Sequence, residues 1–395
     1  MTALILLATL LAGLVPLATP LRHARLWRAT ITPLASIVGS GFLVLGPILQ
    51  HGYGYMAPVV MAALCLGAFA FGGAIRYNIF ARAATEARGA AETRLETLAS
   101  WALAFAYVIS VAYYLNLFGA FAVSLTPLAG QPYARIATTL VFLLILAAGW
   151  TRGFRALEHM EQWSVGLKLA VIAGLLAGLS LFFLRKARDG ALTLDPPLLT
   201  GWPAVTLAFG LIVTVQGFET ARYLGEEYDP PTRQRAMWLA QVVSTTIYMI
   251  YIGLIAFVFT PDAANLSETA IIDMMRTVAP ILPVLLVAAA LAAQFSAAVA
   301  DTGGAGGLIT ELTRGRISPP SGYAALVAAG LLLTWALDIF SIIAYASRAF
   351  ALYYTLQSAI AACAAHRKGD GIRMAGYGAL AILGLAITLL GQPAE

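Results

Sequence analysis

The chain has 395 residues, of which 60% are apolar and only 11% are charged. Soluble domains carry roughly 45–50% apolar and about 25% charged residues. This composition therefore excludes a soluble enzyme and indicates that lipid surrounds most of the chain. The formal charge of +5 does not indicate nucleic-acid binding, because the basic residues lie in short segments between apolar runs, a pattern typical of membrane topology.

Crossing the hydrocarbon layer of a bilayer takes about 20 mostly apolar residues. Such runs occur twelve times, near residues 2–20, 30–50, 56–76, 97–125, 134–150, 164–184, 202–224, 237–260, 279–301, 322–337, 339–365 and 373–391. The sequence therefore predicts an all-α polytopic membrane protein with about 12 transmembrane helices.

The basic residues predict how these spans are oriented. The first span has no basic stretch before it, and Arg22, Arg25 and Arg28 follow it, which is the reverse of a signal peptide. With the loop at 21–29 in the cytoplasm, alternate loops hold most of the basic residues, as the positive-inside rule expects. We therefore predict a multi-pass protein of the inner (plasma) membrane with its N-terminus outside.

Catalytic and metal-binding patterns are not found. The four histidines and two cysteines have no metal-ligand or disulfide spacing, and no convergent catalytic set or nucleotide-binding P-loop is evident. We therefore predict no enzyme activity, no metal and no cofactor.

Two spans contain glycine at their middle. The span 30–50 contains Gly39-Ser40-Gly41, and the span 202–224 contains Gly217 with polar residues on both sides. Glycine weakens a helix and allows its backbone to unwind. Close packing of helices through small residues is the alternative explanation.

The spacing of these features favours an inverted repeat. Gly41 and Gly217 are 176 residues apart, and Lys168 and Arg348 are 180 apart. Five spans run from the one that contains Gly41 to the one before Gly217, and an odd number inverts the second unit relative to the first. We predict five-helix units at 30–190 and 200–365, flanked by an extra helix and basic loop at 1–29 and a C-terminal helix at 373–395. Inverted repeats with discontinuous first helices indicate a secondary transporter.

An interrupted helix has a specific chemistry. Unwinding frees N–H groups at the start of one half-helix and C=O groups at the end of the other. The N–H end favours a carboxylate and the C=O end favours an ammonium group. A zwitterion such as an α-amino acid fits both.

The residues around the interruptions resemble a known family. GSGFLVLGP at 39–47 resembles the first-helix G-S-G-I-F-x-x-P pattern of the amino acid–polyamine–organocation (APC) transporters. GFETARYLGEEYDPPTRQRA at 217–236 resembles their sixth-helix pattern, and Lys168 matches a lysine that many Na⁺-independent members carry in their fifth helix. The resemblance implies a five-plus-five fold, alternating access and a small amine-containing substrate. By this resemblance Phe218 is a lid over the substrate.

Ionisable residues inside spans are costly and are functional candidates. Lys168 is interpreted as a proton-coupling group or a built-in cation, since a desolvated lysine can release its proton and an arginine cannot. Snorkelling to the interface is its alternative role. Asp301 either pairs with Lys168 or faces water at the helix end.

Six further charged or polar residues have more than one possible role. Glu219 and Arg222 are three residues apart and could form a local ion pair, or Glu219 could bind an amine at the interruption. Arg348 could pair with Glu219 or hold an anionic group of the substrate. In the fourth span Tyr107, Tyr113 and Asn116 line the pocket or serve ordinary packing.

These features predict a secondary active transporter of amino acids or related solutes, coupled to protons. Gly39, Ser40 and Gly41 would bind the carboxylate, and groups at Gln216, Gly217, Phe218 and Glu219 would bind the remainder. The expected partners are this small solute and membrane lipids, without nucleic acid. The alternatives are a transporter-fold receptor and a transporter of another small organic cation or anion.

Overall fold

The computed structural model describes residues 1–14, 24–39, 41–83, 89–151, 155–225, 227–260 and 266–394, with the side chains of 83 and 155–164 left aside. Every regular element in these ranges is helical. The α-helices are α1 (Thr2–Leu14), α3 (Arg25–Ile37), α4 (Gly41–Tyr53), α5 (Ala57–Ala83), α6 (Ala90–Val123), α7 (Gln131–Thr151), α8 (Arg155–Arg188), α9 (Gly201–Gly210), α10 (Pro230–Ile255), α11 (Ala270–Val278), α12 (Leu282–Leu312), α13 (Pro319–Ala336), α14 (Ile339–Arg367) and α15 (Gly371–Leu390). Short 3₁₀ helices are η2 (Gly54–Met56), η3 (Ile212–Val215) and η4 (Phe218–Tyr223).

Eight helical segments of the described chain are long and apolar enough to cross a membrane. They are α6, α7, α10, α12, α14, α15, the segment Gly41–Arg82 that joins α4 to α5, and Val165–Arg188 of α8. The protein is thus an all-helical, multi-pass membrane protein. The expected twelve spans are not confirmed: in the described residues some other apolar runs form shorter helices, such as α1 with 13 residues and α9 with 10.

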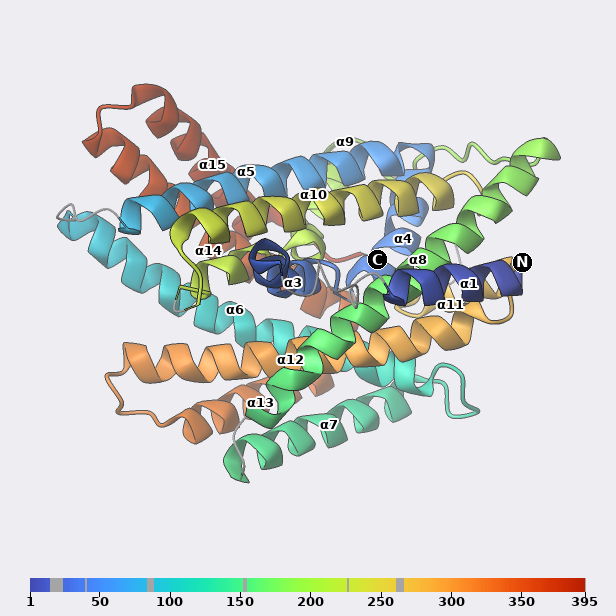
Figure 1. The fold of residues 1–395 in the computed structure, drawn as a ribbon, viewed down its shortest axis with the longest axis horizontal. Coiled ribbons are helices and arrows are strands. Elements are labelled where there is room, and N and C mark those ends of the chain that lie inside the picture. Colours follow the sequence, from blue (N-terminus) through green and yellow to red (C-terminus); the bar gives the residue numbers. More distant parts are fainter. Residues whose placement is uncertain are drawn as a thin grey trace.

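The long helices run side by side along the long axis of the molecule (Figure 1). The helices α5, α12 and α14 finish at one end of the molecule, at the left of Figure 1, and α6 and α8 finish at the opposite end. The left-hand end carries basic residues in its loops and at the adjoining helix ends, namely Arg314, Arg316, Arg367, Lys368 and Arg373. We call it the basic end, and it is the end that the charge pattern predicts to be cytoplasmic.

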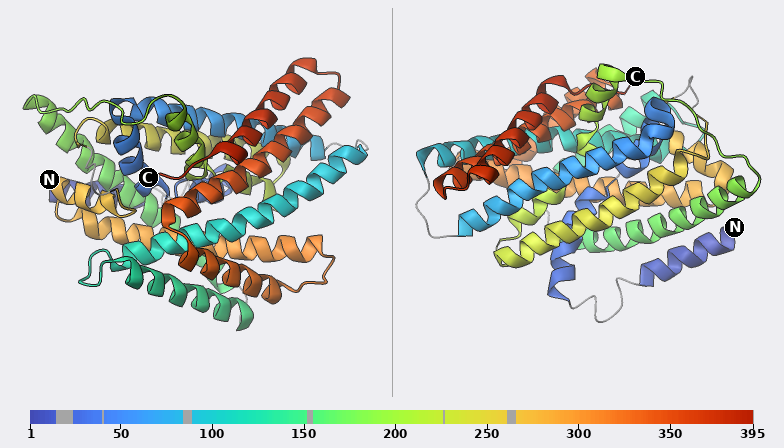
Figure 2. Two further views of the ribbon diagram at one scale, coloured as in Figure 1. Left: turned by 180° about the vertical axis from the view of Figure 1, so that it is seen from behind. Right: turned by 90° about the horizontal axis from the view of Figure 1, so that it is seen from above.

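The interrupted helices lie inside this bundle. α3 packs against α10, and α4 contacts α5, α10 and η3. Around them the core is rich in aromatic residues, and Tyr113, Tyr248, Tyr251, Tyr353 and Tyr354 are among its largest fully buried side chains. The last turns of α14 and the first turns of α15 form a hairpin end that projects from the bundle, and α1 lies along α8 (Figure 2).

Glycine allows some of these helices to approach closely. A Cβ atom on Gly119 of α6 would collide with Ala134 O and Thr138 Oγ1 of α7. Thr138 Oγ1 lies 2.9 Å from Leu115 O on α6, so a hydrogen bond accompanies the close contact. A Cβ atom on Gly253 of α10 would have no heavy atom of another part of the structure within 4 Å.

We expect Gly119→Ala to lower the free energy of unfolding by about 1–3 kcal/mol, because overpacking forces α6 and α7 apart. Gly253→Ala is the matched control, and we expect it to be neutral or to stabilise by up to about 1 kcal/mol through helix propensity. Thermal unfolding of the purified protein in detergent measures both. Equal melting temperatures for the two variants would contradict the close α6–α7 contact.

Candidate functional site

The first interruption separates α3 from α4. α3 ends at Ile37, and the N–H of Val38 closes it by donating to Leu34 O at 2.9 Å. Gly39 lies outside both helices, and the predicted carboxylate ligand Ser40 lies outside the described residues. α4 begins at Gly41, where a Cβ atom would lie 2.7 Å from Tyr113 Oη and 3.2 Å from Thr214 Cα. Only glycine leaves room for this approach.

The second interruption separates α9 from η4. α9 ends at Gly210, η3 follows, and Gln216 and Gly217 connect it to η4. Gly217 has a φ angle of +114°, a region that L-residues with side chains rarely adopt. Gly217, which the sequence predicts to interrupt the helix, therefore lies in a turn that requires glycine.

The two interruptions lie side by side. A Cβ atom on Gly217 would lie 2.6 Å from the carbonyl carbon of Ser36 and 2.7 Å from the backbone nitrogen of Ile37, so the second break packs directly on the last turn of α3. The hydroxyl of Tyr248 lies between them, 2.7 Å from Ile37 O and 2.8 Å from Thr214 O. The two interruptions, far apart in the sequence, are thus in direct contact.

Ser347 of α14 satisfies backbone groups that the second interruption frees. Its hydroxyl donates to Gly210 O at 2.6 Å and accepts from Val213 N at 3.0 Å. On the other side of α9, the backbone N–H of Gln392 donates to Thr206 O at 2.9 Å, and Gly210 leaves no room for a side chain against Gln392 O. Without such partners, a broken helix at membrane depth would be strongly unfavourable.

Glu219 is buried beside the second interruption, with 1% of its surface exposed. Its Oε2 accepts from Gly217 N at 3.0 Å and from the Tyr354 hydroxyl at 2.9 Å. Phe218 stacks on the same tyrosine ring, with 5.2 Å between centroids, and is itself buried.

The predicted ion pair between Glu219 and Arg222 is wrong, since none is formed between these two described residues. The turn at Gly217 exposes a backbone N–H that takes the Glu219 carboxylate. The Arg222 guanidinium instead binds Glu96 of α6.

Gln216 is a buried polar side chain at the same interruption. Its Nε2 donates to the Tyr114 hydroxyl at 3.1 Å. Its Oε1 is buried and accepts no hydrogen bond from the described part of the chain. An acceptor in this condition is costly and suits a ligand with N–H donors.

Lys168 connects α8 to the first interruption. Its Nζ donates to Ala35 O at 3.1 Å, and only 5% of the residue is exposed. The carbonyl belongs to the last turn of α3, where the negative end of the helix dipole favours a cation. A cavity of about 20 Å³ lies beside it, lined by Gly39 and Phe42 among others.

Asp301 and Tyr107 lie on neighbouring helices, α12 and α6. Asp301 Oδ2 accepts a hydrogen bond from the Ser110 hydroxyl of α6. Gly304 of α12 packs against the Tyr107 ring, which also makes an edge contact with Phe350. A pair between Asp301 and Lys168 stays a prediction.

The remaining sequence-predicted residues have separate positions. Tyr113 contacts Gly41 at the first interruption. Asn116 instead donates to Thr334 Oγ1 at 2.8 Å and ties α6 to α13. Arg348 donates from Nε to Thr388 O of α15 at 2.7 Å. Asn116 and Arg348 therefore connect neighbouring helices, and their place in the pocket stays a prediction.

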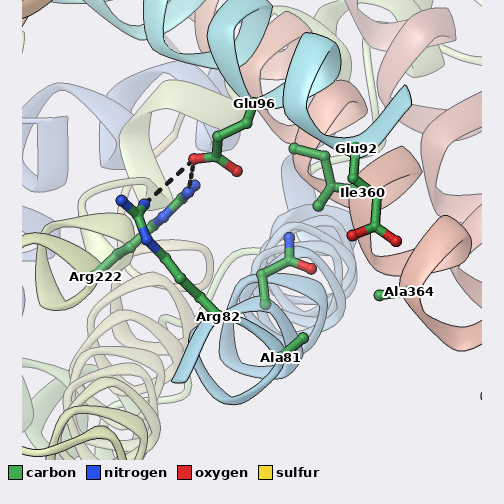
Figure 3. Close-up of a pocket in the computed structure, with 8 residues that line it drawn as sticks. Ala81, Arg82, Glu92, Glu96, Arg222, Ile360 and Ala364 are labelled. Atoms are coloured by element: carbon green, nitrogen blue, oxygen red, sulfur yellow. Dashed lines mark hydrogen bonds and ion pairs between the residues drawn. The ribbon is translucent and has the colours of Figure 1, made fainter. Parts of the chain in front are cut away.

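The basic end carries a charged cluster that the sequence analysis missed. Arg82 of α5 and Arg222 of η4 both reach Oε1 of Glu96 on α6 (Figure 3). One turn earlier on α6, Glu92 pairs with Arg367 of α14 at 2.6 Å. We call Arg82, Glu96 and Arg222 the Glu96 cluster. The spacing of Glu92 and Glu96, which places both on one helix face, was the available signal.

Cavities lie at both ends of the molecule. One of about 480 Å³ at the basic end is lined by the Glu96 cluster, Tyr223 and Arg233, among others. At the opposite end, a cavity of about 300 Å³ is lined by residues that include Gln50, His51 and Asp273. There the loop after α8 covers α4, with Leu199 N donating to Gly52 O at 2.9 Å.

Adjacent interrupted helices inside a membrane bundle are typical of secondary transporters. A sequence model of APC superfamily transporters matches residues 19–391 of this chain. An uncharacterized protein of Aquifex aeolicus (strain VF5) is 40% identical over 383 residues, which cover 95% of this chain and 93% of that protein. The chain belongs to the APC superfamily of transporters, and the family resemblance of its motifs is confirmed.

We expect Ser347→Ala to lower the free energy of unfolding by about 1–3 kcal/mol, because Gly210 O and Val213 N would lose their shared partner. Ser358→Ala is the matched control: Ser358 is also buried in α14, and its Oγ has no hydrogen-bond partner in the described chain. Unfolding of both variants in detergent gives the comparison. A Ser347→Ala variant as stable as Ser358→Ala would refute this role of Ser347.

Proposed function

We propose that the protein is a secondary active transporter of amino acids or related amine-carboxylate solutes, working by alternating access and coupled to protons in the inner membrane. The observation that carries the proposal is the contact between the two interruptions, with Gly217 against Ser36 and Gly41 against Thr214. Peptide groups freed in the middle of a bundle can bind a zwitterion, because their N–H and C=O ends favour opposite charges.

The contacts around the interruptions support a position for each end of the solute. The carboxylate would bind at the start of α4, by Gly39, Ser40 and Gly41, because the first N–H groups of a helix have no acceptor within it. The ammonium would lie near Gln216, whose buried Oε1 has no donor in the described chain. Phe218, stacked on Tyr354, would have to shift as a lid when the solute enters.

We further propose that residues 30–190 and 200–365 are inverted five-helix units. Each interruption then belongs to the first helix of its unit. The contact from Lys168 to Ala35 joins the fifth helix of the first unit to its first helix. α1 and α15 lie outside these units, against α8 and α14 respectively.

The cavity sizes support a closed state of such a transporter. The 20 Å³ cavity beside Lys168 has room for about one water molecule, which is too little for an amino acid. Solute binding therefore requires the helices around the interruptions to separate. The larger cavities at the two ends would be the routes, and the Glu96 cluster would close the route on the basic end.

Lys168 is the proposed coupling group. When protonated, its ammonium holds the last turn of α3 to α8 through Ala35 O. A neutral amine would weaken this charge-assisted bond and release the half-helix that borders the solute site. A single proton would thereby control the mobility of α3.

Uptake of radiolabelled amino acids into proteoliposomes tests both function and coupling. We expect an imposed pH gradient to raise the initial uptake rate and a protonophore to remove the increase. Lys168→Ala should lose this pH dependence, and Lys168→Arg should lose it too, because arginine keeps its proton.

Two outcomes would contradict this reading. Unchanged pH dependence in Lys168→Ala would show that the lysine is not the coupling group. Solute binding with no uptake under any gradient would instead favour a transporter-fold receptor.

Gly217→Ala tests the second interruption. We expect backbone strain of about 1–3 kcal/mol at this φ angle, together with a clash against Ser36, and therefore uptake lowered by at least severalfold. Gly253→Ala should transport at the parental rate. Normal uptake by a stably folded Gly217→Ala protein would remove this turn from the solute site.

A further inference from the structure

Three guanidinium groups meet at the cavity of about 480 Å³ on the basic end. Arg82 comes from α5, Arg222 from η4 and Arg233 from α10. Arg82 NH1 lies 3.5 Å from Glu96 Oε1, the oxygen that Arg222 also binds. Arg233 NH1 donates to the backbone oxygen of Arg222 at 2.7 Å. The three cations therefore occupy one small volume.

The carboxylates around the cavity do not balance these charges. Glu96 and the exposed Glu311 are the acidic residues that line it in the described chain, so three positive groups face two negative ones. Two nearby carboxylates have other partners, since Glu92 pairs with Arg367 and Asp229 with Arg25. Arg222 is only 7% exposed, and repulsion between like charges is stronger where water is scarce.

Arg82 and Arg233 have N–H groups that donate no hydrogen bond within the described residues. Arg82 has a side chain that is 58% exposed and a single, long contact with Glu96. Arg233 Nε is buried and donates to no acceptor in the described residues. A guanidinium group offers five N–H donors in a planar fork that matches the oxygens of carboxylates and phosphates.

We propose that this cavity is a binding site for an oxyanion, a carboxylate or a phosphate, held by Arg82 and Arg233 beside the Arg222–Glu96 pair. The anion neutralises the excess positive charge and takes up the unused donors. Its source is either a soluble anion or the headgroup of an anionic phospholipid, because basic groups at the cytoplasmic membrane surface attract such headgroups. Glu96 competes with the ligand for Arg82.

Chemical modification of arginine by phenylglyoxal, followed by peptide mass spectrometry, tests the site in the full-length protein. We compare the modification rates of Arg82 and Arg233 in zwitterionic-lipid nanodiscs with and without sodium acetate or sodium phosphate. A bound anion slows modification by one plus the ratio of its concentration to Kd, or about tenfold at ten times Kd. Arg188, exposed at the opposite end, is the control and should not be protected.

A second arm identifies the source. Nanodiscs that contain phosphatidylglycerol, without added anion, should protect the two arginines if the ligand is a headgroup. Protection by acetate or phosphate in zwitterionic discs instead identifies a soluble anion. Absence of protection in both arms, or equal protection of Arg188, overturns the proposal.

Variants give the sharpest prediction. Glu96→Gln removes the competing charge, so the anion concentration that half-protects Arg82 should fall. Arg233→Gln should raise the half-protecting concentration at Arg82, and Arg188→Gln should leave it unchanged. Weaker protection in a folded Glu96→Gln protein would show that the cluster is only an ion pair. None of these readouts depends on uptake, so the site and the proposed transport function can fail separately.

Discussion

The need to pair every peptide N–H and C=O at membrane depth governs this structure. Two helices stop near the middle of the bundle, and each stop frees backbone groups that lipid cannot satisfy. Ser347 supplies both a donor and an acceptor to the second interruption, and Lys168 caps a carbonyl of the first. Gly41 and Gly217 have no side chain, which allows the two interruptions to contact each other. The aromatic core packs around this arrangement.

Electrostatics at the basic end follow a second constraint, which acts across distant parts of the chain. Arg222 lies only five residues after Gly217. Its ion pair with Glu96, which Arg82 also contacts, therefore connects η4 to α6 and α5. Movement at the interruption must therefore disturb this charged contact. The helix η4 therefore connects the proposed solute site to the proposed anion site.

Much of this architecture could be predicted from local sequence. Gly41 and Gly217 mark positions where only glycine fits, and the motifs around them were sufficient for the family. What depends on partners far along the chain could not be predicted. Arg222 binds Glu96, 126 residues away, rather than Glu219 within its own turn, and Ser347 has no motif. The sequence predicts twelve spans, whereas eight long apolar helices are found in the described residues. Hydropathy identifies an apolar run but does not indicate where a helix within it ends.

The hydroxyl of Tyr248 shows how the two interruptions could select their solute. This hydroxyl carries one hydrogen, yet two carbonyl oxygens lie within reach, those of Ile37 and Thr214. Together with the amide oxygen of Gln216, these groups provide more hydrogen-bond acceptors than hydrogen-bond donors. An alkylammonium brings three hydrogens, whereas an ether or a carbonyl compound brings none. Selectivity for a solute rich in N–H donors can thus arise from these uncharged oxygen acceptors, in addition to the buried Glu219 beside them.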